Sequence, residues 1–504
     1  MLIEPSKETV LTAYNEGKPQ VVWTTLVADL ETPVSAMLKL SQGEEHCFLL
    51  ESVEGGAVRG RYSIIGMNPD LVFKTIAQDA WLGTPQQLAS DTMDKQDAPA
   101  LTALREILDQ SRIELPENLP PMAAGMFGYL GYDNVRLMED LPEPSYDPLD
   151  LNDTLLIRPL IIVIFDNVKD ELTMISPIRP EAGVSAETAY SRAVERLTST
   201  LDRLDAHLDR SADTEDTDLV IEMRSNTTED EYFEMVRRAK EYITAGDIFQ
   251  VVLSQRFETE FTLPPFALYR ALRRVNPAPF LYFLKFGDFA IIGSSPEILV
   301  RARDGEVSIR PIAGTRPRGA TPEEDAALSR ELLADPKELA EHLMLLDLGR
   351  NDVGRVAEIG TVEVTDQFFL EYYSQVMHIV SNVVGKLSDK YDAIDALSAG
   401  FPAGTVSGAP KVRAMEIIDE LEKDKRGPYG GAVGYFTADG YMDTCIVLRT
   451  SVVKDGMMYV QAGAGIVADS VAASEQQECM HKARALFRAA EEAVRFASST
   501  SRGQ

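Results

Sequence analysis

Cysteine is scarce in this chain of 504 residues, in which Cys47, Cys445 and Cys479 are the three thiols. Their number is odd and their spacing is wide, which argues against a disulfide framework and against a zinc site. No cysteine lies in a glycine-flanked elbow, and no Ser-His-Asp or Cys-His set is recognisable. We therefore expect a protein of the reducing cytoplasm without a thiol or serine nucleophile.

Long apolar runs are missing too. The longest apolar stretch, residues 155–165, is interrupted by Arg158 and Pro159 and is far too short to cross a bilayer. It predicts a buried strand instead. The first ten residues contain no basic segment followed by an apolar one, so we expect no secretory signal.

Basic residues are outnumbered, with 49 Lys and Arg against 80 Asp and Glu, which gives a formal net charge of −31. Such a surface repels nucleic acid and anionic membranes, so we expect neither as a partner. It also repels small anions at long range. An anionic substrate would therefore need a local cluster of positive groups.

The composition divides the chain into four segments. Residues 1–195 are expected to form an N-terminal domain, 196–227 an acidic linker, 228–496 a second domain and 497–504 a disordered tail. The linker is expected because Asp, Arg, Ser and Thr are dense there.

Helix starts are legible in the second domain from their capping residues. The predicted caps are Thr228 with Glu231, Thr321 with Glu324, Asp335 with Pro336, and Ser474 with Gln477. Strands are predicted at residues 248–257, 280–286, 290–292 and 444–453. Because helices and strands are mixed without regular alternation, the predicted fold class is α+β, with large and mainly antiparallel sheets.

Two acids remain after helix capping has been taken into account. Glu338 is explained by the cap at Asp335, whereas Glu341, one turn later, is not. Likewise Gln477 is explained by the predicted cap, and Glu478 is left over. Two carboxylates in the first turns of two helices could hold a magnesium ion together with water and ligand oxygens. Taken singly, each acid is equally well explained by the helix dipole.

Four glycine-containing loops, residues 311–319, 404–411, 429–434 and 463–465, lie in the second domain. Glycine lets backbone N–H groups approach an anion, although any one loop is more simply a tight turn. The glycine spacing fits neither a phosphate-binding loop nor a dinucleotide fingerprint, so no nucleotide site is expected. Arg316, Arg449 and Lys482 lie close to these loops in sequence, which favours recognition of a small carboxylate.

His378 lies in the apolar, β-branched segment 376–380 and is predicted to lie on or near a buried strand. A neutral, packed histidine is the simpler interpretation. A side chain that titrates near neutrality is also suited to accept or donate a proton in catalysis.

Nine motifs in order carry a resemblance to a known family. They are Leu49-Leu-Glu-Ser52 and residues 246–252, 276–282, 295–297, 311–319, 335–351, 405–416, 426–436 and 463–482. With these motifs the chain resembles the chorismate-utilising enzymes, and within them the large subunits (component I) of anthranilate synthases. The resemblance covers nearly the whole chain. It implies an α+β sandwich with a tryptophan-binding N-terminal domain and a large, chorismate-binding catalytic domain.

The resemblance also implies ligand sites. Magnesium would be held by Glu341 and Glu478, with Glu338 and Glu475 close by. Chorismate would be bound by Gly314, Thr315, Tyr429, Arg449, Gly463, Ala464, Gly465 and Lys482. Tryptophan, a feedback inhibitor, would be bound by Ser52, Pro279, Phe280 and Leu281.

The catalytic residues are implied in the same way. Glu297 would protonate the departing C4 hydroxyl of chorismate, and His378 would serve the elimination of pyruvate. Gln250 replaces a lysine with which related enzymes activate water, so ammonia would be the nucleophile. The expected activity is the conversion of chorismate and ammonia to anthranilate and pyruvate. A partner glutamine amidotransferase subunit would supply the ammonia in a hetero-oligomer.

Two other functions remain open from the sequence. An aminodeoxychorismate synthase component I would aminate C4, but many of those enzymes carry a lysine where this chain has Ala313. A non-catalytic, tryptophan-binding regulatory protein would have no need to retain acids such as Glu297, Glu341 and Glu478.

Overall fold

The computed structural model describes residues 1–54, 58–142, 146–208, 219–373 and 376–497. Its described strands are linked into one 22-stranded sheet. The pairs between these strands are antiparallel throughout, for example β2 (His46–Glu54) with β11 (Phe280–Phe286) and β6 (Gly125–Leu130) with β19 (Ala432–Thr437). The α+β fold class with mainly antiparallel sheets is therefore confirmed.

Two long strands fold this sheet into two layers. The first half of β3 (Val58–Ile76) pairs with β2 and its second half with β4 (Asp79–Gly83). In the same way β7 (Thr154–Asp166) pairs with β6 at its start and with β8 (Glu171–Ile178) at its end. The register shifts after Pro69, which lies opposite Pro159. Proline cannot donate to a strand ladder, so both strands bend where they pass from one layer to the other.

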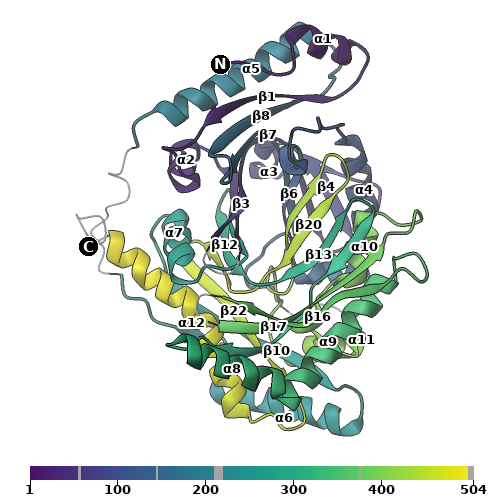
Figure 1. The fold of residues 1–504 in the computed structure, drawn as a ribbon, viewed down its shortest axis with the longest axis vertical. Helices are drawn as coiled ribbons and strands as arrows, with labels where there is room; N and C mark the ends of the chain where they lie inside the picture. Colours follow the sequence, from purple (N-terminus) through teal and green to yellow (C-terminus); the bar gives the residue numbers. More distant parts are fainter. Residues whose placement is uncertain (55–57, 143–145, 209–218, 374–375, 498–504) are drawn as a thin grey trace.

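The first layer runs from β1 to β10 and the second from β5 to β17. Figure 1 labels β1, β12 and β10 of the first layer and β4, β6 and β17 of the second. The first contains, in order, β1 (Gln20–Val27), β8, β7, β3, β2, β11, β12 (Phe289–Ser295), β21 (Thr450–Lys454), β22 (Met457–Ile466) and β10 (Gln250–Glu260), with the short β9 (Arg224–Ser225) and β18 (Gly408–Ala409) on β10. The second contains β5 (Asp94–Lys95), β4, β3, β7, β6, β19, β20 (Met442–Ile446), β13 (Ile298–Arg303), β14 (Glu306–Ile309) and β17 (Val376–Lys386), with β15 (Ile312–Pro317) and β16 (Glu363–Tyr372) on β17.

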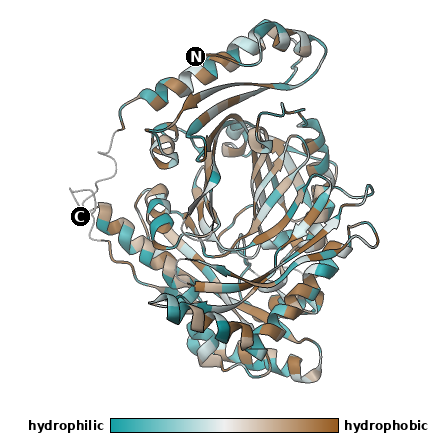
Figure 2. Cartoon of the chain, in the orientation of Figure 1, coloured by the Kyte–Doolittle hydropathy of each residue, from teal (hydrophilic) through white to brown (hydrophobic). Residues whose placement is uncertain are grey.

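Helices cover the outer face of each layer. On the first layer lie α1 (Lys7–Asn15), α2 (Pro33–Leu40), α5 (Ala186–Asp205), α6 (Glu229–Ala245), α7 (Pro265–Val275), α11 (Lys411–Leu421) and α12 (Ala472–Ala497). On the second lie α4 (Ala100–Gln110), α9 (Pro336–Gly354) and α10 (Ala393–Gly400), and two further helices are α3 (Pro85–Ala89) and α8 (Pro322–Ala334). Apolar and polar residues alternate along these helices (Figure 2), so each buries one side against its sheet.

The space between the two layers is filled by a separate apolar cluster. Phe48 of β2 stacks on Phe127 of β6 with ring centroids 4.6 Å apart, and Tyr282 and Val433 belong to the same cluster. The molecule is therefore a helix–sheet–sheet–helix sandwich. None of the described helices is long and apolar enough to span a membrane.

Most local predictions agree with the structure. Thr228, Thr321 and Asp335 cap α6, α8 and α9, and the predicted strand 280–286 coincides with β11. The buried strand predicted at 155–165 is β7.

Three predictions need correction. The boundary placed at residue 195 falls inside α5, which ends at Asp205, because the polar composition there marks the solvent side of a helix. The helix predicted to open at Ser474 begins at Ala472, since the N–H of Glu475 already donates to the carbonyl of Val471. The single strand predicted at 444–453 is two strands, β20 and β21, separated by residues 447–449. Residues 209–218 of the predicted linker and residues 498–504 of the predicted tail lie outside the described residues.

Candidate active site

The chain crosses between the two layers at two adjacent places. One crossing, between β12 and β13, contains Glu297, and the other, between β20 and β21, contains Arg449. The amide of Ile446 donates to the carbonyl of Glu297 at 3.0 Å, and the amide of Ser294 donates to the carbonyl of Arg449 at 3.2 Å. Arg449 has a φ of 48°, a conformation that non-glycine residues rarely adopt. These bonds hold the two crossings together, with Glu297 and Arg449 within electrostatic range of each other.

Glu297 is only 6% exposed. Burial raises the pKa of its carboxyl to about 8, although the nearby Arg449 guanidinium favours the charged form. The carboxyl therefore keeps its proton at neutral pH. A buried carboxylic acid beside a cation is a donor in reach of an anionic ligand.

His378 lies on β17 opposite Thr315 of β15. Its Nδ1 is 3.1 Å from the carbonyl oxygen of Gly314 and 3.0 Å from the hydroxyl of Thr315. Because the carbonyl can only accept, this contact assigns the proton to Nδ1 and leaves Nε2 as an acceptor. Burial, and after it the charge of Arg449, lower the pKa of the imidazole to about 4. His378 is therefore a neutral base next to the two crossings.

The glycine-containing segment 463–465 lies on β22 beside β10. A Cβ atom at Gly463 would lie 2.9 Å from the hydroxyl of Tyr429, and one at Gly465 would lie 2.4 Å from Nε2 of Gln250. Both positions therefore need glycine if these side chains are to stay in place. Lys482 of α12 donates to the carbonyl of Gly463 at 2.9 Å. Tyr429, Gln250 and Lys482 thus converge on this backbone segment, which also contains Ala464.

The four acids predicted near a metal lie on two neighbouring helix starts. The pKa of Glu341 on α9 is raised by burial and then by the charges of Glu338 and Glu478. The pKa of Glu475 on α12 is raised by burial and by Glu478. Glu341 and Glu475 therefore both lie within electrostatic range of Glu478.

Positive side chains already pair with two of these acids. Arg316 donates to Glu338 at 3.1 Å, and Lys482 to Glu478 at 2.7 Å. Among the described residues, no group of three or more His, Cys, Asp or Glu side chains is arranged to hold a metal. The donor set still fits magnesium, which accepts one or two protein carboxylates and takes its other oxygens from water and ligand. A Cβ at Gly314 would lie 3.2 Å from Oε2 of Glu338, so the acids adjoin the segment that contacts His378.

The segments predicted to bind tryptophan also lie side by side. Ser52 of β2 is paired with Phe280 of β11, next to Leu281 and Pro279. Sequence analysis missed the network that fixes them. The carboxylate of Glu51 accepts hydrogen bonds from the Tyr269 hydroxyl at 2.5 Å and from Arg273 at 2.7 and 2.9 Å. The available signal was the position of Glu51 directly after the apolar run 46–50, because a buried charge needs partners.

Two more residues of the site were missed. Tyr373 packs its ring edge-on to His378 with centroids 5.5 Å apart, and it influences Arg449 electrostatically. Ser294 donates through its hydroxyl to the carbonyl of Asn276 and through its amide to Arg449. No sequence pattern distinguishes either residue. Ser294 meets Arg449 through a pairing that is distant in sequence, whereas Tyr373 directly follows β16 and its amide donates to the carbonyl of Val376.

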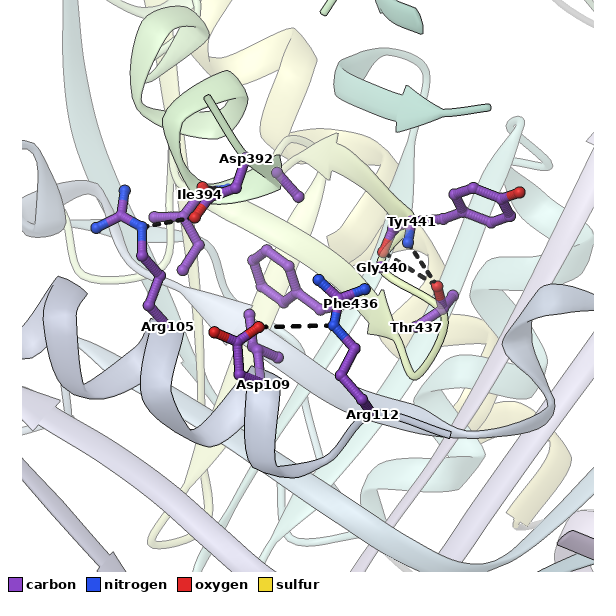
Figure 3. A pocket seen from close by; sticks show the side chains of 11 residues that line it. Arg105, Asp109, Arg112, Asp392, Ile394, Phe436, Thr437, Gly440 and Tyr441 are labelled. Carbon is purple, nitrogen blue, oxygen red and sulfur yellow. Dashed lines mark hydrogen bonds and ion pairs between the residues drawn. The ribbon is translucent and has the colours of Figure 1, made fainter. Parts of the chain in front are cut away.

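A cavity elsewhere does not compete for the role of substrate site. It lies between α4, α10 and the β19–β20 hairpin, lined by residues such as Asp109, Arg112 and Tyr441 (Figure 3). Its volume of about 30 Å³ is close to that of one water molecule. Arg105 at its edge is bound by Asp392 at 2.6 Å and Asp395 at 2.5 Å. The groups that could recognise an anion there are therefore engaged already.

Comparison with known proteins gives the family. The model of a family described as chorismate binding enzyme matches residues 45–488. The chain belongs to this chorismate-binding enzyme family. It is 55% identical to anthranilate synthase component 1 of Cereibacter sphaeroides, over 99% of this chain and 100% of that protein. It is 48% identical to the component 1 of Pseudomonas aeruginosa, over 92% and 94% of the two chains.

Solved structures agree with the fold of this chorismate-binding enzyme. Anthranilate synthase component I from Streptococcus pneumoniae superposes with a TM-score of 0.74 at 38% identity, covering 85% of this chain and 92% of that one. The menaquinone-specific isochorismate synthase of Escherichia coli superposes with a TM-score of 0.71 at 18% identity, covering 96% and 98%. The second likeness extends to the fold alone.

Substituting Glu297→Gln should change how the stability of the chorismate-binding enzyme depends on pH. In the unfolded chain this carboxyl ionises near its ordinary pKa of 4.5, whereas in the native state it ionises near 8. The proton it retains stabilises the native state below pH 4.5, and that contribution is lost as pH rises to about 8. The unfolding free energy of the variant, measured with urea, should therefore gain on the parent between pH 5 and 8 and then level off.

The exposed Glu117→Gln is the matched control. A constant difference between Glu297→Gln and the parent from pH 5 to 9 would contradict the raised pKa.

Proposed function

We propose that this chain is the chorismate-converting component of an anthranilate synthase, a lyase that makes anthranilate and pyruvate from chorismate and ammonia. The observation that carries the proposal is the meeting of a protonated acid, a guanidinium and a neutral imidazole at the two layer crossings: Glu297, Arg449 and His378. Relatives 55% and 48% identical along almost their full length are named anthranilate synthase component 1, which supports it.

Binding of the substrate comes first. Chorismate carries two carboxylates, and this acidic chain must attract it locally. Arg449 and Lys482 supply positive charge beside Gly314, Thr315 and the 463–465 segment. Backbone N–H groups in segments without side chains can approach a carboxylate closely.

The first half-reaction replaces a hydroxyl. Ammonia attacks C2 of the ring, the double bonds shift, and the C4–O bond breaks. Hydroxide is a poor leaving group, so the proton on Glu297 passes to the departing oxygen, which leaves as water. The retained proton at neutral pH suits Glu297 to this step.

We propose that Glu341 and Glu478 hold a magnesium ion, with Glu338 and Glu475 close by. When bound, magnesium supplies a positive charge that stabilises negative charge on the ring carboxylate of the substrate. The charges of Glu338 and Glu478 raise the pKa of Glu341, and the charge of Glu478 raises the pKa of Glu475, which supports a cation there.

The second half-reaction makes the ring aromatic. The C2 proton passes to Nε2 of His378, the C3–O bond breaks, and the side chain leaves as enolpyruvate, which takes a proton to become pyruvate. The Gly314 carbonyl fixes the tautomer that leaves Nε2 free to accept.

Two residues separate this activity from its alternatives. Gln250 has no amine with which to activate water, which favours ammonia as the nucleophile. Ala313 on β15 likewise offers no amine, which disfavours amination at C4 as in aminodeoxychorismate synthase.

We propose that a separate glutamine amidotransferase subunit supplies the ammonia. All three cysteines are free and buried. Burial raises the thiol pKa of Cys47 to about 12 and of Cys479 to about 11, and it raises that of Cys445 as well. None is a thiolate at neutral pH, so none can attack glutamine. Three free thiols also support a location in the reducing cytoplasm.

The purified chain should convert chorismate to anthranilate with ammonium salts and magnesium, followed by product fluorescence and chromatography. Glutamine alone should give almost no product, and chelation of magnesium should abolish turnover.

Glu341→Gln and Glu478→Gln should each require far more magnesium, with Glu117→Gln as control. Formation of a C4-aminated product, or full turnover of both variants without metal, would refute the assignment.

His378→Met should block the second half-reaction while it keeps the bulk of the side chain. Proton transfer of this kind contributes about 100- to 10,000-fold in rate. The aminated intermediate, which still carries its enolpyruvyl group, should accumulate with little pyruvate. Chromatography of the reaction mixture would detect it. Unconsumed chorismate would instead assign His378 to the first step, and anthranilate at the parent rate would make it a packing residue.

We propose that tryptophan inhibits by binding against the paired strands β2 and β11, where Ser52 lies beside Pro279, Phe280 and Leu281. The proposal has a physical route to the substrate. The Ser294 hydroxyl donates to Asn276, three residues before Pro279, and its amide donates to the carbonyl of Arg449. A ligand that moves the Asn276 loop would therefore shift the arginine that orients chorismate.

Ser294→Ala should weaken tryptophan inhibition by about tenfold while leaving turnover without tryptophan near the parent rate, because a typical coupling free energy is 1–3 kcal/mol. Ser52→Phe should abolish inhibition by filling the binding site. Ser451→Ala removes a comparable buried hydroxyl, 3.3 Å from the Ile292 carbonyl, and serves as control. Inhibition curves of Ser294→Ala that match those of the parent would exclude this route. Inhibition unchanged in Ser52→Phe would exclude the site.

A further inference from the structure

Three arginines gather around one aspartate where β7 and β8 separate, away from every residue assigned above. Arg158 lies on β7, Arg179 directly follows the last residue of β8, and Arg196 lies on α5. Arg158 acts electrostatically on Arg179, so the two guanidiniums lie near each other although β7 and β8 are paired only as far as Ile162 and Ile175. Asp70 of β3 influences both Arg179 and Arg196 electrostatically.

Asp70 is already engaged by Arg158. Nε and one terminal nitrogen of Arg158 donate to its two carboxylate oxygens at 2.8 and 2.9 Å, and the other terminal nitrogen donates to Ser111 at 3.0 Å. Arg196 donates to the Ser176 hydroxyl at 2.9 Å and to the Pro177 carbonyl at 3.4 Å, both uncharged acceptors.

Arg179 has no such contacts. Its Nε and both terminal nitrogens are buried, and among the described residues none of them has a hydrogen-bond partner. A guanidinium has five N–H donors, and a buried charge without acceptors is costly. Burial, and after it repulsion by Arg158, lower the pKa of Arg179 to about 10. The guanidinium therefore remains charged at neutral pH.

The charge balance of the cluster is therefore positive. Arg192 and Glu195 of α5 are the other charged groups that act on Arg196, and they carry one charge of each sign. Three guanidiniums thus face one carboxylate, within a chain whose net charge is −31. The loop 180–183 that follows Arg179 is exposed.

We propose that Arg158, Arg179 and Arg196 form a binding site for a small oxyanion, either inorganic phosphate or a free carboxylate. Guanidinium groups bind both through paired N–H···O bonds. The ligand would supply the acceptors that Arg179 lacks and neutralise the excess charge. It would join β7, β8 and α5 at the bend that separates the layers, so binding should stabilise the native chain.

The test is a titration of the full-length chain with inorganic phosphate, and separately with acetate, at constant ionic strength set with sodium chloride. Calorimetric binding and the melting temperature are both measured. The parent should bind at least one of the two anions saturably and melt at a higher temperature as the anion is added. Saturation by phosphate alone, or by acetate alone, supports the site and identifies its ligand.

Arg179→Met should lose this response. In chloride it should melt at or above the parent temperature, because the variant replaces an unpaired buried charge with an apolar side chain of similar length. Arg179→Lys keeps the charge without the planar fork and should bind more weakly than the parent. It also keeps the test decisive if the methionine variant does not fold. Arg192→Met changes a largely exposed arginine on α5, the helix that carries Arg196, and this variant should respond as the parent does.

Two results would overturn the proposal. One is a parent chain that neither phosphate nor acetate stabilises beyond chloride. The other is equal binding by the parent and both Arg179 variants, which would mean an adventitious ion only.

Discussion

The backbone hydrogen bonds between the two layer crossings are the constraint on which the rest of the site depends. Ile446 donates to Glu297, and Ser294 donates to Arg449, so two segments about 150 residues apart in sequence lie side by side. Each crossing contains one ionisable side chain, that of Glu297 or that of Arg449. The left-handed conformation of Arg449 is sustained because the strands on both sides are fixed by pairing.

Low polarity around the crossings acts on acids and bases in opposite directions. The same burial that keeps Glu297 protonated keeps His378 unprotonated, since each group adopts its neutral form. A proton donor and a proton acceptor therefore coexist at neutral pH a short distance apart. The acids of α9 and α12 adjoin Gly314, and burial raises the pKa of Glu341 and Glu475 there as well.

Local signals were sufficient for much of the fold. Caps such as Thr228 and Asp335 and the apolar strand 280–286 are determined by neighbouring residues, so they could be predicted from sequence. The break at Arg449 could not be predicted, because residues 444–453 are mostly apolar or β-branched and are compatible with a single strand. The break follows from the partner strands, β13 on one side and β12 on the other. The start of the helix that begins at Ala472 was misplaced because Ser474, in its first turn, resembles a cap. For the candidate site, the family motifs gave the residues and the structure gave their grouping, whereas the contact of Ser294 with Arg449 and the partners of Glu51 depend on segments that are distant in sequence.

The order in which the strands are synthesised bears on how the polypeptide reaches its native state. Ser52 of β2 pairs with Phe280, and Leu130 of β6 pairs with Ala432, so each early strand lacks one of its neighbours until a much later part of the chain has been made. Contacts of such high sequence separation slow folding, and unpaired edges promote aggregation meanwhile. The second layer can therefore close along β6 only after β19 has been synthesised, near the end of translation.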